Sequence, residues 1–301
     1  MQIHSLDRSQ PYDYVVYGAS VGGILLALHY AAAGYDVLVL NAYGFPGGSV
    51  TESLSCLQQR PEAATPHARQ LFGPLLANPY ALVHEGPEGC VLNPEVLKIS
   101  LQHALEASSV ALLFHVKARA LAPADADGYA TLSLIGKEGE FIVRTRRVFD
   151  ATDAGHLTRL VRRTGQLTGA RLCVFTSPVP EAAAATIQAL AGLQQAVRLS
   201  DGRYWLALGL PAAHPTFVET TANDMLDTLT AVLAPLQARL QIVPAETQLL
   251  YEAAPADFSG YFSCAADLLP GRAYAPHQWL QRAADLEAAV VAAQAAQPAV
   301  Q

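Results

Sequence analysis

Apolar residues near the N-terminus follow a strand–helix–strand order. Residues 14–17 form a short apolar run, residues 24–33 are apolar almost all round, and residues 35–40 form a second apolar run. A helix that is apolar on every side packs on a sheet, and a fully apolar strand is typical of a buried parallel sheet. Gly34 follows the helix, as glycine often does. The pattern predicts a parallel βαβ unit.

The next part of the chain changes from irregular to regular at Asn93. Residues 57–91 contain five prolines and predict irregular structure. Asn93-Pro94-Glu95 is typical of a helix start, because asparagine caps a helix, proline suits its first position and an acid suits its first turn. A strand is expected over residues 110–116.

Alternation of apolar and polar residues marks the following segment. Residues 129–135 and 140–143 alternate with a period of two, which predicts an antiparallel meander. Residues 148–150 begin a further buried strand. Residues 165–257 then mix strand-like pieces (172–176 and 204–210) with helix-like pieces (182–193 and 223–240), which predicts a smaller second α+β layer. An alanine-rich helix over 279–295 closes the chain.

Composition narrows the classes of function. A hydrophobic content of 51% with 15% charged residues describes a chain that buries a large core. A net charge of −7 without a basic cluster argues against nucleic-acid binding. The four cysteines form no C-x-x-C pair, so neither a zinc ribbon nor an adjacent redox dithiol is expected, and no metal site is predicted. With no leader peptide and no long apolar segment, we expect a soluble, cytoplasmic protein that has no membrane partner.

The turn after the first strand carries the candidate chemistry. It reads Gly18-Ala19-Ser20-Val21-Gly22-Gly23, so glycine stands at the first and third positions of a G-x-G-x-x-G pattern and serine at the second. Such a turn brings the backbone and a helix N-terminus up to a dinucleotide pyrophosphate. The residue that usually binds a ribose hydroxyl falls at Asn41. A Rossmann-like fold without a nucleotide stays open on this turn alone.

Further segments extend the match to one family. The sequence resembles the FAD-dependent oxidoreductases of the glutathione-reductase structural type. The resemblance rests on the turn Gly44-Phe45-Pro46-Gly47-Gly48, the segment Asp150-Ala151-Thr152-Asp153-Ala154-Gly155 and the run Ala265-Ala266-Asp267. It covers roughly residues 13–160 and 258–296. It implies an α/β fold with an FAD/NAD(P)-binding Rossmann-like parallel sheet, an antiparallel meander and a smaller second layer. The FAD-binding domain would be 1–160 with 258–301, and residues 161–257 a substrate or partner domain.

The resemblance implies FAD, held non-covalently, as cofactor. It places the cofactor contacts at Gly18, Ala19, Ser20, Gly22, Gly23, Asn41, Ala42, Gly47, Gly48, Ala118, Thr152 and Asp267. Asp267 would bind the ribityl chain of the flavin. Four residues depart from the family pattern: Ser20, Asn41, Asp153 and Ala266. Asp153 is the most consequential, because a carboxylate beside a pyrophosphate repels it.

Two functional hypotheses follow. The first is an FAD-dependent oxidoreductase that acts on a small organic substrate without an NAD(P)H domain of its own, because no second strand–G-x-G-x-x-G–helix unit follows residue 60. The alternative is a cofactor-less flavin fold that serves as a partner subunit, and a homo-oligomer or heteromeric complex stays open. Arg272, Tyr274, His277 and Trp279 are the candidate substrate-side group. No catalytic acid or base is assigned, and His277 is the weak candidate for proton transfer.

Overall fold

The structure is a computed structural model that describes residues 10–162, 166–211, 214–251, 261–272 and 274–295. The predicted boundary at residues 257–258 and the last residues of the predicted FAD-binding domain lie outside this part, as does the side chain of Ala266. Within the described residues, no helix is long and apolar enough to cross a membrane.

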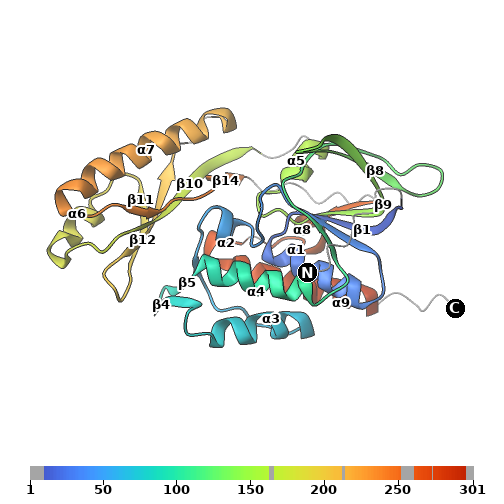
Figure 1. Ribbon diagram of the computed structural model, residues 1–301, viewed down its shortest axis with the longest axis horizontal. Helices are drawn as coiled ribbons and strands as arrows, with labels where there is room; N and C mark the ends of the chain where they lie inside the picture. The colour runs from blue at the N-terminus through green and yellow to red at the C-terminus, as the bar shows by residue number, and fades with distance from the viewer. Residues whose placement is uncertain (1–9, 163–165, 212–213, 252–260, 273, 296–301) are drawn as a thin grey trace.

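A seven-stranded sheet carries the predicted βαβ unit (Figure 1). Its strands in spatial order are β6 (Ala111–Leu113), β2 (Val37–Leu40), β1 (Tyr12–Tyr17), β9 (Gly139–Asp150), β8 (Ala130–Gly136) and β7 (Lys117–Ala122), with β15 (Phe262–Cys264) also paired to β9. Strands β6, β2, β1, β9 and β15 pair in parallel, whereas β7, β8 and the first half of β9 form the predicted antiparallel meander. Fold class and meander are confirmed.

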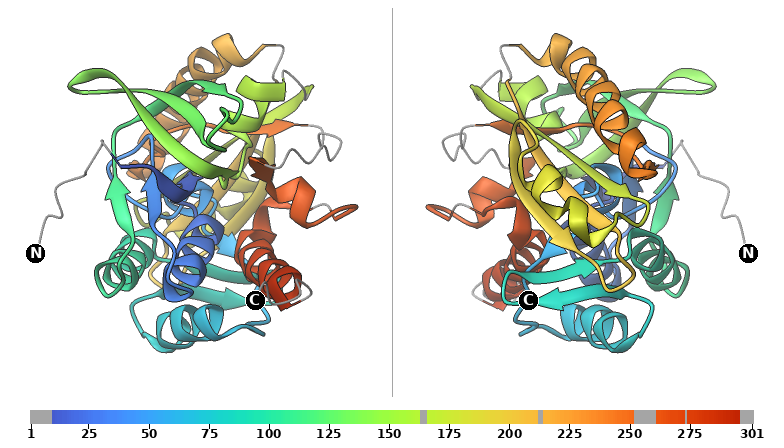
Figure 2. Two further views of the ribbon diagram at one scale, coloured as in Figure 1. Left: turned by 90° about the vertical axis from the view of Figure 1, so that its right-hand side faces the viewer. Right: turned by 90° about the vertical axis from the view of Figure 1, so that its left-hand side faces the viewer.

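Helices cover one face of this sheet and the meander covers the other. The α-helices of the described residues are α1 (Val21–Ala32), α2 (Ser49–Glu52), α3 (Pro66–Ala77), α4 (Pro94–Glu106), α5 (His156–Arg162), α6 (Ala184–Gln188), α7 (Val218–Leu233), α8 (Ala265–Leu268) and α9 (Trp279–Ala295). Val16 and Val39 face a core shared with α1, α3, α4 and α9, and Figure 2 shows α1 beside α9. Their neighbours Val15 and Leu38 face the meander and α5 instead. This alternation is the period of two that a strand imposes.

The second layer is a five-stranded sheet at the other end of the molecule (Figure 1). It contains β11 (Leu193–Arg198), β12 (Tyr204–Leu210), β10 (Leu167–Thr176), β13 (Leu240–Ile242) and β14 (Gln248–Tyr251). Helix α7 covers one face. The other face packs through Phe175 and Trp205 on Leu54 and Leu57 of the first layer. The small sheet β3 (Leu57–Gln58), β5 (Gly89–Leu92) and β4 (Leu82–Gly86) adds to this shared core.

Several predicted elements differ from the structure. Residues 57–91 are not irregular, because they contain β3, α3, β4 and most of β5. Pro66 does not interrupt α3, since it stands in the first turn of the helix, where proline is favourable. The strand expected over 110–116 stops at Leu113, and His115 then adopts a left-handed φ of +59°. Residues 148–150 continue β9. The predicted helix 182–193 shortens to α6 behind a 3₁₀ turn (Glu181–Ala183).

The helix predicted over 223–240 begins earlier, as α7. It is preceded by a 3₁₀ turn at Pro215–Phe217 and followed by another at Ala234–Leu236. A last 3₁₀ turn, Pro276–Gln278, leads into α9. The start of α4 is confirmed, because Asn93 accepts a hydrogen bond from the Glu95 N–H. The division into two domains stays a prediction.

Candidate functional site

Three cavities follow one another along the carboxyl edge of the parallel strands. Tyr17, Leu40 and Asp150 end β1, β2 and β9 at this edge. The outer cavity (about 260 Å³) shares Tyr17, Ala42 and Tyr43 with a middle cavity of about 30 Å³. The middle cavity shares residues 152–154 with an inter-sheet cavity of about 310 Å³ that reaches β14 of the second layer. Ligands of open α/β sheets bind at this edge.

The turn between β1 and α1 is tight because its glycines leave no room for a side chain. Gly18 has a φ of +107°, and a Cβ there would lie 2.7 Å from the Thr152 nitrogen. A Cβ on Gly23 would clash with the Gly18 carbonyl oxygen. Ser20 is the N-cap of α1: its hydroxyl accepts from the Gly23 N–H at 3.1 Å and donates to the Ala151 carbonyl at 2.6 Å. The serine therefore has a structural role of its own.

The Gly47-Gly48 loop lies directly on this turn. The Gly47 N–H donates to the Ala19 carbonyl at 2.7 Å, and Ser20 and Gly47 form a parallel bridge. Gly47 and Gly48 have φ values of +123° and +58°, which favour glycine. A Cβ on Gly48 would lie 2.6 Å from a carboxylate oxygen of Asp153. The loop, the turn and the segment after β9 therefore meet at one point.

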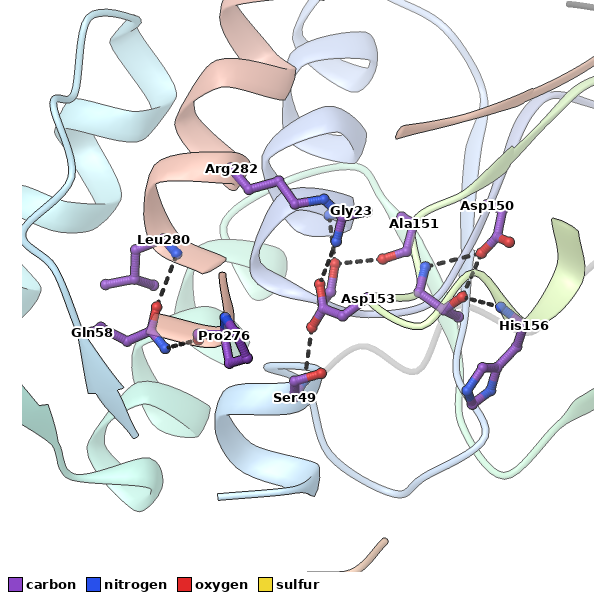
Figure 3. A network of polar contacts seen from close by, with 12 residues as sticks. Gly23, Ser49, Gln58, Asp150, Ala151, Asp153, His156, Pro276, Leu280 and Arg282 are labelled. Atoms are coloured by element: carbon purple, nitrogen blue, oxygen red, sulfur yellow. Dashed lines mark hydrogen bonds and ion pairs between the residues drawn. The ribbon is translucent and has the colours of Figure 1, made fainter. Parts of the chain in front are cut away.

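Asp153 is at the centre of a polar network beside the middle cavity (Figure 3). Its Oδ2 accepts from the Ser49 N–H at 2.8 Å, and its Oδ1 pairs with Nη1 of Arg282 at 3.1 Å. Both side chains are nearly buried, at 11% and 14% exposed. Burial raises the pKa of Asp153, and Arg282 opposes that rise. Arg282 reaches this point from the first turns of α9.

Asp150 holds the segment that presents Asp153. It is 1% exposed, and each of its oxygens has two donors. Oδ1 accepts from the backbone N–H and the hydroxyl of Thr152, and Oδ2 accepts from the same two groups of Thr158. The Thr152 hydroxyl in turn accepts from the His156 N–H at 2.7 Å (Figure 3). A fully bonded buried carboxylate fixes the loop that connects β9 to α5.

Two further acids line the middle cavity, Glu52 of α2 and Glu246 of the second layer. The Glu52 side chain accepts from Nδ2 of Asn41 at 3.0 Å, and its backbone carbonyl accepts from the Glu246 N–H at 3.1 Å. The Tyr43 hydroxyl donates to Glu246 at 2.7 Å. Burial raises the pKa of Glu52 to about 8, with Glu246 and Asp153 adding to the rise, so Glu52 is mostly protonated at neutral pH.

The inter-sheet cavity is lined by apolar and aromatic side chains, by three arginines and by several other polar residues. Its aromatic members are Tyr251, Tyr274 and Trp279. The indole Nε1 of Trp279 is buried and has no hydrogen-bond partner among the described residues. An orphaned buried donor at a cavity wall is suited to a ligand oxygen. The Tyr274 hydroxyl donates to Asp285 at 2.5 Å, and Arg272 pairs with the same carboxylate.

His277 does not line the three cavities described here. Its carbonyl accepts from the Gln59 N–H at 2.7 Å, and burial together with Arg171 lowers the pKa of its imidazole. Gln58 fixes the same stretch of chain, because its amide donates to the Pro276 carbonyl and accepts from the Leu280 N–H (Figure 3). The structure therefore gives His277 a place beside the cavity wall and no contact with the cavity itself.

The predicted cofactor residues other than Asp267 fall into two groups. Gly18, Ser20, Asn41, Ala42, Gly48, Thr152 and Ala118 line the middle or the outer cavity. Ala19, Gly22, Gly23 and Gly47 lie behind them and shape the turn without lining a cavity. Asn41 does not offer a free side chain for a ribose, because its Oδ1 accepts from the Ala19 N–H and its Nδ2 donates to Glu52 and the Phe45 carbonyl. The Ala118 N–H donates to the Tyr17 hydroxyl at 3.0 Å.

Asp267 is placed differently from the expectation. Both of its oxygens pair with Arg162, at 3.1 and 3.0 Å, and Oδ2 also accepts from the Cys264 N–H. It lines none of the three cavities, whereas Cys264 and Ala265 line the inter-sheet cavity. The carboxylate caps its own helix and neutralises an arginine. Its contact with the ribityl chain stays a prediction.

Sequence reasoning missed Arg282, Glu52 and Glu246 as members of the site. Arg282 follows Trp279 by one helical turn, a spacing that places both on one side of α9. Glu52 is the lone acid of residues 37–61, which could have drawn attention to it. Glu246 carries no such signal, because the second layer brings it to the site only through the fold.

One cluster of potential metal ligands lies away from this edge. His29, His67 and Glu287 place one ligand atom each within 4.8 Å of one another. Glu287 is fully buried, and it accepts hydrogen bonds from Thr65 and from the Ala68 N–H at the start of α3. These bonds account for the buried carboxylate as a cap of α3, and we propose no metal there.

The cavities can be compared with the shape of FAD, the expected cofactor. The outer and inter-sheet cavities suit its two ends, and the orphaned Trp279 N–H suits a flavin oxygen or nitrogen. The middle cavity, at about 30 Å³, has room for about one water molecule.

Comparison with solved structures shows the fold. The structure of the p-nitrophenol 4-monooxygenase PnpA from Pseudomonas putida DLL-E4 matches with a TM-score of 0.59 at 17% identity, over 95% of this chain and 79% of that chain. AlpK matches with a TM-score of 0.59 at 16% identity, over 94% and 62%. Aklavinone-11 hydroxylase, solved with FAD and aklavinone, matches with a TM-score of 0.59 at 14% identity, over 94% and 61%. The chain thus spans less than two thirds of the latter two proteins.

The family is shown by the sequence itself. No curated protein matches the sequence. A family profile described as "FAD dependent oxidoreductase" matches residues 13–231, which is more than half of the chain. This match confirms FAD as the family's cofactor and favours the flavoenzyme over the cofactor-less subunit; the glutathione-reductase subtype is not confirmed. The chain belongs to the family of FAD-dependent oxidoreductases.

Proposed function

We propose that this protein uses FAD to oxidise or oxygenate a small aromatic molecule bound in the inter-sheet cavity. The observation that carries the proposal is the row of three cavities, which runs along the carboxyl edge of the Rossmann-like sheet and ends between the two layers. An elongated dinucleotide lies along such an edge, with its reactive ring at the far end. The second layer then closes the cavity from the other side.

The cavity wall supports an aromatic substrate. It combines flat and apolar side chains with arginines: Leu249, Leu250, Tyr251, Leu269, Tyr274, Trp279, Arg159 and Arg272. Such a wall favours a planar ring that carries an electron-rich or anionic group, because guanidinium groups bind anions and stack on rings. Arg159 already lies over the Tyr251 ring, 3.1 Å from its centroid. The similar structures include a p-nitrophenol 4-monooxygenase and an enzyme described as an aromatic hydroxylase.

The chain's own residues have binding roles in this proposal. Bound FAD supplies reversible two-electron chemistry. Trp279 offers its N–H to the cofactor or substrate, and the Arg272–Asp285–Tyr274 network holds one side of the cavity. The lowered pKa of His277 keeps its imidazole neutral near pH 7. Because His277 lines none of the three cavities, no catalytic base is assigned.

Electrons enter from an organic substrate or a partner protein in this account. The described residues contain one parallel β–α–β turn of the dinucleotide type, β1–α1–β2, and the FAD needs it. A dedicated nicotinamide domain would need another. We therefore expect NADH and NADPH to reduce the bound flavin slowly.

Ligand binding and product analysis test the proposal. FAD-loaded protein is titrated with phenol, p-nitrophenol and an anthraquinone carboxylate, and the flavin absorption band is followed. We expect a saturable change of the band with at least one ring compound and none with cyclohexanol. If the protein oxygenates, dithionite-reduced, desalted protein under air yields a product with one added oxygen atom, with the reduced flavin as the two-electron donor and water as the second product. If it oxidises, protein that carries oxidised FAD yields a product that has lost two hydrogen atoms. An unperturbed band and unchanged compounds throughout would overturn the proposed substrate class.

A further inference from the structure

We infer that Asp153 occupies the place of the cofactor's diphosphate, and that FAD binding exchanges this carboxylate for a phosphate on the same partners, the Ser49 N–H and Arg282. The inference rests on the proposed function, since it concerns FAD in the cavity row. It assigns Arg282 as a cofactor ligand and Asp153 as an internal competitor of the cofactor.

Asp153 lies between the two larger cavities. Its carboxylate lies where three backbone segments meet, against Gly48, Ser20 and Ser49, between the outer and inter-sheet cavities. A molecule that joins the two larger cavities must pass this point. The middle cavity measures about 30 Å³ with Asp153 in place, which is too small for two phosphates.

The groups that bind Asp153 are also typical phosphate ligands. A backbone N–H and a guanidinium are the donors that phosphates take in proteins. Here they bind a carboxylate instead, at 2.8 Å to Ser49 and 3.1 Å to Arg282. Asp153 thus imitates a phosphate within the chain. The ring of Trp279 lies under the same guanidinium, 5.2 Å away, and holds it at the cavity.

The charge of Arg282 can be balanced by one anion at this point. Arg282 is 14% exposed, and a nearly buried cation needs an anion close by. Either the carboxylate or a phosphate satisfies it, but both together would add negative charge to a site that Glu246 also lines. A phosphate and the Asp153 carboxylate therefore exclude each other beside Arg282. In the apoprotein, Asp153 balances the charge of Arg282.

The test compares FAD affinities of apoprotein variants by quenching of flavin fluorescence. Asp153→Asn keeps the side-chain shape and removes the charge, and Asp153→Ala also removes the bulk. We expect both to bind FAD about 10- to 100-fold more tightly than the wild type, because they remove the repulsion between a carboxylate and the phosphate beside it. Asp227→Asn removes an acid from the exposed surface of α7 that lines none of the three cavities, and it should leave the affinity within about twofold.

Arg282→Gln in the Asp153→Asn background separates the two roles of the arginine. If phosphate takes over Arg282, the double variant loses at least about tenfold in FAD affinity relative to Asp153→Asn. If Arg282 only neutralises Asp153, the two bind equally, and the assignment of Arg282 is wrong. Circular dichroism and melting curves confirm that each variant is folded, and the double variant avoids leaving Asp153 buried without its cation.

The outcomes separate this inference from the proposed function. FAD uptake by the wild type with no gain in Asp153→Asn or Asp153→Ala overturns the inference and leaves the proposed function standing. Failure of every folded variant to take up FAD overturns both. An equal gain in Asp227→Asn would show a general charge effect and would also overturn the role given to Asp153.

Discussion

Gly23→Ala is expected to weaken both the fold and FAD binding, and Gly23→Leu to abolish them. A Cβ at this position clashes with the Gly18 carbonyl oxygen and lies 2.9 Å from the Ala151 side chain. The turn between β1 and α1 must open to admit it, which moves the backbone that faces the cofactor. Overpacking of this kind lowers the free energy of unfolding by about 1–3 kcal/mol for a single methyl group, and by more for leucine.

A matched glycine in the same layer controls for this effect. Gly73 lies within α3 with no atom within 4 Å of the position of an added Cβ, so Gly73→Ala should leave stability unchanged or raise it by up to ~1 kcal/mol. Urea unfolding and FAD titration of the three variants supply the comparison. Equal free energies of unfolding and equal FAD affinities of Gly23→Ala and Gly73→Ala would contradict the claim that the turn at Gly23 has no room for a side chain.

Glu52→Gln is expected to stabilise the protein in alkaline solution. The folded-state pKa of Glu52 is raised from 4.5 to about 8, so the folded protein keeps a proton that the unfolded chain releases. The free energy of unfolding of the wild type therefore falls as pH rises from about 4.5 to about 8. Glutamine keeps an oxygen for the Asn41 amide and does not titrate. The advantage of the variant grows across this window and reaches ~5 kcal/mol above it.

Urea unfolding at pH 4.5, 6.5 and 8.5 measures this window, with Glu106→Gln on the exposed surface of α4 as the control for net charge. The control should differ from the wild type by less than about 0.5 kcal/mol at each pH. Parallel pH profiles of wild type and Glu52→Gln would mean that Glu52 titrates normally and that the middle cavity is not a low-dielectric site.

The local rules of sequence were sufficient for the βαβ unit. The apolar runs, Gly18 and Gly23, and the Asn93 cap each act over a few residues, and the structure contains β1, α1, β2 and α4 where these patterns predict them. The prolines of residues 57–91 were misleading, because Pro66 falls in the first turn of α3, where it favours the helix. The identity of the residue alone cannot tell a helix start from a break.

Long-range contacts set the part of the site that sequence could not predict. Asp153 meets Arg282 across 129 residues, and the fold alone decides that α9 begins beside the end of β9. Asp267 matched a cofactor-binding pattern by its position in the chain, yet its carboxylate is taken up by Arg162, 105 residues away. A pattern gives the kind of side chain at a position but not the partner that satisfies it.

Uptake of FAD by the purified protein tests the central claim most directly. Apoprotein is mixed with increasing FAD, passed through a desalting column and denatured, and the released flavin is counted against the protein. The account predicts one FAD per chain at saturation, quenched flavin fluorescence on binding and loss of uptake in Gly23→Leu. Protein that remains folded but retains no flavin at any FAD concentration would contradict the account.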